Sequence, residues 1–195
     1  VDGRTLRFYT DTGGGLFIVR AAVDRLGLTV KKVGEEEQKR EFVVLPEFKP
    51  DAGIPAPLSG KGMIPVWAPP PEDRGTVPMN ADGILGQEWF AGRVWTFDYP
   101  NGRLLLRSPG DVPVHDSKHE IALGFQAAAS GKRGLNFPRI QAVIDAETID
   151  FLLDSGATTA VSDEAVAVIR DQGPAERATS FIIESVFRKW RTRHP

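Results

Sequence analysis

Two stretches of the chain, VDGRTLRFYTDTG (residues 1–13) and IDAETIDFLLDSG (residues 144–156), align without a gap. Both end in Asp-Thr/Ser-Gly, and the second Asp follows the first by 143 positions (154 minus 11). A repeat in register predicts two related halves, each placing one carboxylate at the same point of its fold. The identical pairs are Asp2/Asp145, Thr5/Thr148, Phe8/Phe151, Asp11/Asp154 and Gly13/Gly156.

The residues around the first copy predict a strand, a tight turn and a helix. Leu6, Phe8 and Thr10 alternate with polar neighbours, which is typical of a strand. The glycines at 13–15 then favour a turn. Apolar residues recur at helical spacing between 18 and 26, and Gly27 is placed to end that helix.

The middle of the first half predicts further strands separated by a long connection. EFVVL (residues 41–45) predicts a strand, and DGILGQEWF (82–90) a strand followed by a Gly turn and a short helix. Apolar segments around residues 94–99 and 103–106 flank Pro-Asn-Gly and predict a hairpin. Between them, residues 46–78 are dense in Pro and Gly, which favours a long loop or an exposed hairpin with its tip at Ser59, Gly60, Lys61 and Gly62.

The second half predicts strands before the second Asp and helices after it. Alternating apolar residues at 121–125 and at 140–144 favour strands. Ser162 is placed to cap a helix through Ile169, and a last helix is predicted over about 176–192. The chain is therefore expected to be mainly β with short helices. We expect a first lobe at residues 1–107, a linker at 108–119 and a partial second lobe at 120–195.

Composition excludes several classes of function. The 195 residues carry a net charge of −2, which gives no electrostatic basis for binding nucleic acid. No apolar run approaches the roughly 18 residues that a membrane helix needs. The chain has no cysteine, so disulfides and thiolate metal sites are excluded.

Paired carboxylates predict acid–base chemistry. Two carboxylates about 3 Å apart cannot both ionise cheaply, so they share one proton. The ionised member takes a proton from water while the protonated member donates to a carbonyl oxygen, which hydrolyses an amide without a covalent intermediate. Such a pair, here Asp11 and Asp154, needs neither a metal nor an organic cofactor. We expect Thr12 and Ser155 to brace the two loops. The close approach of the backbones depends on the glycines that follow, Gly13 and Gly156.

This order of motifs resembles the pepsin-like and retropepsin-like aspartic proteases. An apolar strand, Asp-Thr/Ser-Gly and a later Ile-Leu-Gly are its signature, and the first half has each of them in turn. The resemblance implies an acid-protease fold of two pseudo-symmetric lobes acting on a peptide or protein substrate. It also implies that Ile84, Leu85 and Gly86 thread beside the catalytic loop as a ψ-shaped motif. The Pro/Gly-rich segment with its tip at 59–62 lies where that family has its flap.

Two departures from the family pattern keep other functions open. The first motif continues as Gly-Gly where the family has Ala or Ser, and the flap region has no tyrosine, since the chain's two tyrosines are Tyr9 and Tyr99. Trp67 is the aromatic residue nearest to the predicted flap. One alternative is a catalytically silent peptide-binding module on the same fold. Another is an assembly unit whose cleft is formed with a second chain.

The second half lacks a counterpart of the Ile-Leu-Gly strand. Gly86 follows Asp11 by 75 positions (86 minus 11), so the equivalent glycine would fall near position 229 (154 plus 75), beyond Pro195. We therefore expect the second lobe to be incomplete and the chain to be a piece of a longer two-lobed protein.

Overall fold

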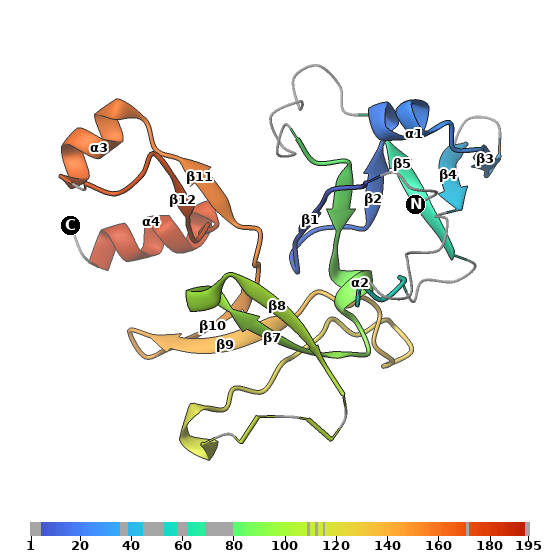
Figure 1. Ribbon diagram of the computed structural model, residues 1–195. Helices are drawn as coiled ribbons and strands as arrows, with labels where there is room; N and C mark the ends of the chain where they lie inside the picture. Colours follow the sequence, from blue (N-terminus) through green and yellow to red (C-terminus); the bar gives the residue numbers. More distant parts are fainter. Residues whose placement is uncertain are drawn as a thin grey trace. The chain divides into compact units, whose positions relative to one another are not determined.

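The computed structural model describes residues 5–35, 39–44, 53–57, 62–68, 80–108, 110–111, 113–114, 116–170 and 172–193. The described part is mainly β with a few short helices, as the sequence predicts (Figure 1). The chain divides into two compact units, Val1–Ser155 and Gly156–Pro195. The lobes expected at 1–107 and 120–195 follow the sequence repeat and stay a prediction.

A mixed six-stranded sheet forms the largest part of the first unit. Its strand order is β1-β6-β2-β5-β4-β3. β6 runs parallel to β1 and antiparallel to β2, so it lies between two strands that are close to each other in sequence (Figure 1). The strands are β1 (Phe8–Thr10), β2 (Phe17–Val19), β3 (Val30–Val33), β4 (Arg40–Val44), β5 (Met63–Trp67) and β6 (Gly83–Leu85).

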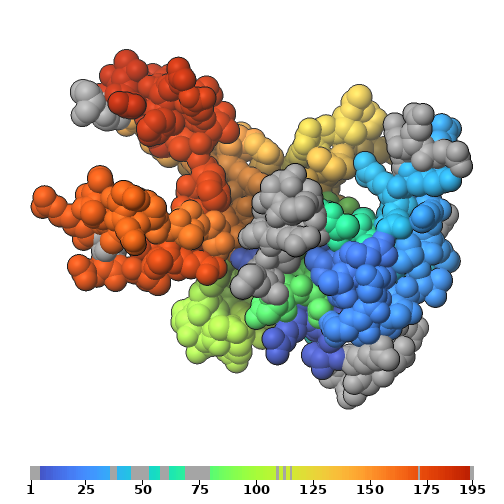
Figure 2. Space-filling model, turned by 90° about the horizontal axis from the view of Figure 1, so that it is seen from above, coloured from blue at the N-terminus to red at the C-terminus, as the bar shows by residue number. Residues whose placement is uncertain are grey.

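Helix α1 (Arg20–Leu26) covers the core of this sheet. It buries Ala22, Val23 and Leu26, and it ends at Gly27, whose φ of 65° is the left-handed conformation that the sequence predicts for a helix stop. The core beneath it comes from strands distant in sequence: Ile18, Val43 and Ile64 are 0–1% exposed. The mid-blue to light-blue residues, which include α1, β3 and β4, lie together on the right of the view (Figure 2).

Helix α2 (Gln87–Phe90) and the hairpin of β7 (Val94–Asp98) and β8 (Arg103–Arg107) follow β6. The turn of the hairpin has Asn101 bonded to the Asp98 side chain and Gly102 at φ 60°, which confirms the predicted Pro-Asn-Gly turn. Trp89 is 4% exposed and contacts Trp95 with ring centroids 4.4 Å apart.

A second hairpin, β9 (Arg139–Ile144) with β10 (Glu147–Leu152), leads to the second Asp. Its two-residue turn has positive φ at Asp145 and Ala146. The strand predicted from the alternation at 121–125 is wrong: this segment is irregular and makes a single bridge, between Gly124 and Arg139. Alternating apolar and polar residues do not form a strand here because the segment diverges from β9 after the pair of Gly124 and Arg139.

The second unit contains a small antiparallel pair, β11 (Thr158–Ala160) with β12 (Glu176–Ala178), and two helices. Helix α3 (Asp163–Ile169) is capped by the Ser162 side chain, which accepts from the N–H of Ala165, as predicted. The helix predicted over 176–192 is wrong in its first part. Residues 176–178 pair with β11, and helix α4 begins later, at Glu184–Arg193. Among the helices that the structure describes, none is long and apolar enough to cross a bilayer.

Candidate active site

Asp11 and Asp154 meet within the first unit, each placed by the strand before it. Asp11 follows β1 directly, and Asp154 stands two residues after the end of β10. Both are partly buried, and their carboxyl groups are hydrogen-bonded to each other. The structure therefore brings together the two carboxylates that the sequence repeat singles out.

The environment of the pair raises the pKa of Asp11 from its ordinary value of 3.8 to about 6. Burial is the largest cause, because it disfavours the charged form. The hydrogen bond to Asp154 and the negative charge of that residue act in the same direction. Backbone N–H groups of Gly13 and Gly14 oppose them by stabilising the carboxylate, and Gly13 N–H donates to Asp11 Oδ1 at 2.9 Å. The balance keeps one proton on the pair in mildly acidic solution.

Reciprocal hydrogen bonds between Thr12 and Ser155 hold the two Asp loops together. Thr12 Oγ1 donates to the carbonyl of Leu153 at 2.6 Å and accepts from the N–H of Ser155 at 2.9 Å. The N–H of Thr12 donates in return to Ser155 Oγ at 3.1 Å. Thr12 is only 6% exposed, so water competes little for these bonds. Because each bond joins residues next to an Asp, together they fix the separation of the carboxyl groups.

Two glycines of the first loop leave the space that the carboxyl groups occupy. A Cβ at Gly13 would lie 2.3 Å from Cγ of Asp154, and a Cβ at Gly14 would lie 2.5 Å from Oδ2 of Asp11. Any side chain at either position would therefore push on one member of the pair. Gly156, the counterpart of Gly13 in the repeat, begins the second compact unit.

Ile84 and Leu85 form the body of β6, which runs beside the first Asp loop. The N–H of Asp11 donates to the carbonyl of Leu85 at 3.1 Å, and the N–H of Gln87 donates to the carbonyl of Gly14 at 2.9 Å. Gly86 lies between these bonds, and a Cβ there would be 2.2 Å from the carbonyl oxygen of Gly14. The close approach of the two backbones thus requires glycine at position 86.

Gln87 is a further anchor that the sequence analysis missed. It is 5% exposed, and its Oε1 accepts from the N–H of Asn136 at 2.9 Å. This bond ties the α2 end of β6 to the segment just before β9. A buried polar residue directly after Ile-Leu-Gly is the signal in the sequence, but the partner 49 positions away has no motif that marks it.

The predicted flap is described only at its edge. Ser59, Gly60 and Lys61 lie outside the described residues, and Gly62 directly precedes β5. Trp67, at the end of β5, packs against Phe17 with ring centroids 4.9 Å apart. It therefore takes part in the six-stranded sheet.

The described residues hold no group of three His, Cys, Asp or Glu side chains that could bind a metal ion. No protein-family model, curated protein or solved structure matches this chain.

Proposed function

We propose that the chain is the catalytic part of an aspartic endopeptidase with a pepsin/retropepsin-like fold. The observation that carries the proposal is the hydrogen-bonded pair of Asp11 and Asp154, with the pKa of Asp11 raised to about 6. Pairs of carboxylates that share a proton act as general acid and general base at once. The bonds between Thr12 and Ser155 support this role because they hold the pair without using its oxygens.

In the proposed reaction, water is the nucleophile. The ionised carboxylate takes a proton from a water molecule held by the pair, and the water oxygen attacks the scissile carbonyl carbon. The protonated carboxyl donates its proton to the carbonyl oxygen, which gives a tetrahedral diol. The protonated carboxyl then donates its proton to the leaving nitrogen while the other carboxylate takes a proton from a diol hydroxyl. The C–N bond breaks, a carboxylic acid and an amine are released, and one proton again lies on the pair. Both groups must hold one proton between them, so activity should fall as pH rises through about 6.

The architecture of the first unit supports the fold part of the proposal. A strand ends in Asp-Thr-Gly, and a later strand carrying Ile-Leu-Gly runs parallel to it and bonds to the loop. This is the arrangement that the resemblance to aspartic proteases implies. The lack of a Cβ at Gly13 and Gly14, where one would meet the carboxyl groups, is consistent with a loop shaped around the pair.

The test is hydrolysis of a fluorescence-quenched peptide library between pH 3 and pH 8. We expect cleavage in the acid range, inhibition by pepstatin-like compounds, and loss of cleavage in Asp11→Asn and in Asp154→Asn. Asp24→Asn is the matched control, since this aspartate lies on the exposed surface of α1 and should cleave as the unchanged chain does. Cleavage that persists in Asp11→Asn would remove the pair from the mechanism. Binding of library peptides without cleavage would favour the silent peptide-binding module.

A further inference from the structure

Strand β9 has one edge that is bonded to β10 and an opposite edge that is largely open. The two-residue turn makes Ile144 and Glu147 a hydrogen-bonded pair. Because hydrogen-bonded and non-hydrogen-bonded pairs alternate along an antiparallel ladder, the backbone groups of Ala142 and Ile140 also bond to β10. The backbone groups of Arg139, Gln141 and Val143 then face the opposite edge of β9. This edge is the one next to residues 120–125.

Only the first of these three residues is paired on that edge. Arg139 exchanges two bonds with Gly124, at 2.8 Å and 3.0 Å. Within the described part of the chain, the backbone groups of Gln141 and Val143 that face this edge make no hydrogen bond. Val143 is 72% exposed, so the edge is accessible. An accessible strand edge of this kind is a template for pairing with another strand.

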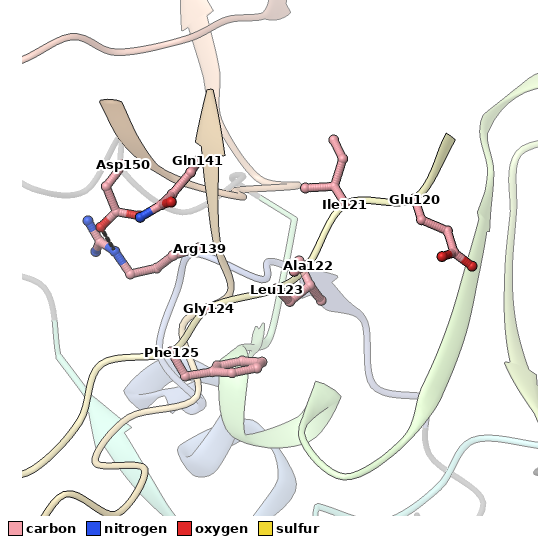
Figure 3. Close-up of a pocket in the computed structure, with 9 residues that line it drawn as sticks. All are labelled: Glu120, Ile121, Ala122, Leu123, Gly124, Phe125, Arg139, Gln141 and Asp150. Atoms are coloured by element: carbon pink, nitrogen blue, oxygen red, sulfur yellow. Dashed lines mark hydrogen bonds and ion pairs between the residues drawn. The ribbon is translucent and has the colours of Figure 1, made fainter. Parts of the chain in front are cut away.

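A cavity of about 690 Å³ opens where the segment 120–123 diverges from β9. We call this cavity the edge slot. One wall is the hairpin, with Arg139, Gln141 and Asp150, and the other is residues 120–125 (Figure 3). Neither Asp11 nor Asp154 lines it. It is therefore a different place from the candidate active site.

The two walls of the edge slot have complementary chemistry. On the hairpin wall, Arg139 Nε donates to Asp150 Oδ2 at 2.5 Å, so these charges neutralise each other (Figure 3). On the other wall, Ile121 and Leu123 are 64% and 50% exposed. The slot thus offers open backbone groups of β9 beside apolar side chains. The Arg139–Asp150 pair adds no net charge, and Glu120 brings one further carboxylate to the lining.

The size of the edge slot fits one extended strand. Four residues at about 3.3 Å each span about 13 Å, a strand takes about 4.8 Å of sheet width, and its side chains span about 10 Å. Their product is about 620 Å³, close to the volume of the slot. The hairpin of a second copy would bring two strands and needs about twice that space.

We propose that the edge slot binds an extended peptide of about four residues, which adds to β9 as a third strand. The peptide pairs with Gln141, which lines the slot, and continues along the same edge to Val143, which lies beyond the lining residues. The backbone of the peptide exchanges hydrogen bonds with these two residues, and its apolar side chains contact Ile121 and Leu123. Recognition of this type takes its affinity from main-chain bonds and its selectivity from alternate side chains. The binding site does not depend on the proposed peptidase activity.

The test is an NMR titration of the full chain with the capped peptide acetyl-Thr-Val-Thr-Val-amide. We expect saturable shifts of the Gln141 and Val143 amides, larger than those of Asp11 and Thr12. The same peptide N-methylated at both valines keeps its side chains but loses two backbone N–H donors. It should bind at least tenfold more weakly. Asp11→Asn should bind as the unchanged chain does, which separates this site from the active site.

Gln141→Pro is the decisive variant because it removes an N–H from the open edge and leaves the bonds to β10 in place. Thr148→Pro is its matched control, since it makes the same change on the outer edge of β10. We expect Gln141→Pro to lose binding at least tenfold and Thr148→Pro to keep it, with both unfolding near the temperature of the unchanged chain. Equal binding by the N-methylated peptide, or undiminished binding in Gln141→Pro, would overturn the proposal. Dimerisation through this edge without peptide binding, detected by sedimentation, would overturn it as well.

Discussion

The raised pKa of Asp11 makes the stability of the protein depend on pH in a specific direction. A carboxyl that binds its proton more tightly in the folded state stabilises that state while it is protonated, and loses this contribution as pH rises through the folded-state pKa. For Asp11 the window runs from pH 3.8 to about pH 6. Replacing Asp11 with Asn removes the titrating group and keeps a similar shape. The variant should therefore be more stable than the unchanged chain above pH 6.

The size of the effect follows from the two pKa values. A difference between 3.8 and about 6 corresponds to about 3 kcal/mol at 1.4 kcal/mol per pKa unit. Because Asp11 is only partly buried, solvent screens part of this energy, and we expect about 1.5 kcal/mol. At pH 4 the free energies of unfolding of the two proteins should differ by much less. At pH 7 Asp11→Asn should be more stable by about 1.5 kcal/mol.

Urea denaturation followed by tryptophan fluorescence measures this difference between pH 4 and pH 8. Trp89 and Trp95 report on the first unit, where the pair lies. Taking the difference between the variant and the unchanged chain at each pH cancels the titration of all groups that are not coupled to Asp11. A difference that stays constant from pH 4 to pH 8, or an Asp11→Asn variant that is less stable at pH 7, would refute the reasoning.

Three further predictions concern the groups that hold the loops. Thr12→Val should lower the free energy of unfolding by about 2 kcal/mol because two bonds to Oγ1 are lost, whereas Thr12→Ser should retain most of it; urea midpoints compare the two. Gly86→Ala should cost about 3 kcal/mol because its Cβ would meet backbone atoms, whereas Gly15→Ala, with nothing within 4 Å, should change the urea midpoint little; similar midpoints would contradict the close approach. Gln87→Leu should cost about 1–2 kcal/mol and shift the Asn136 amide resonance, because that N–H loses its acceptor; an unmoved resonance would contradict the bond.

The sequence predicts the local elements whose causes lie within a few residues. The end of α1 at Gly27, the cap of α3 by Ser162 and the turn before Gly102 each depend on one glycine or one hydroxyl in a short window. The repeat also singles out Asp11 and Asp154, because a duplicated motif marks both members of a pair at once. These predictions need no knowledge of long-range packing.

Long-range packing decides the parts that the sequence did not predict. Residues 176–178 have a pattern compatible with a helix, but pairing with β11 makes them a strand. Residues 121–125 alternate in polarity as a strand does, yet within this segment only Gly124 makes a β-bridge, to Arg139. Two features depend on segments that are distant in sequence, so no local pattern could show them. One is the hydrogen bond from the N–H of Asn136 to Gln87, and the other is the close approach of the Asp154 carboxyl group to Gly13.

The central claim is that Asp11 and Asp154 share a proton, and a carboxyl titration tests it most directly. The ¹³Cγ resonance of Asp11, assigned by its loss in Asp11→Asn, is followed from pH 2.5 to pH 8. We predict a midpoint near pH 6 in the unchanged chain and a lower midpoint in Asp154→Asn, since the hydrogen bond and the charge from Asp154 both raise the pKa of Asp11. A midpoint near 3.8 in the unchanged chain, or one that Asp154→Asn leaves unmoved, would contradict the account.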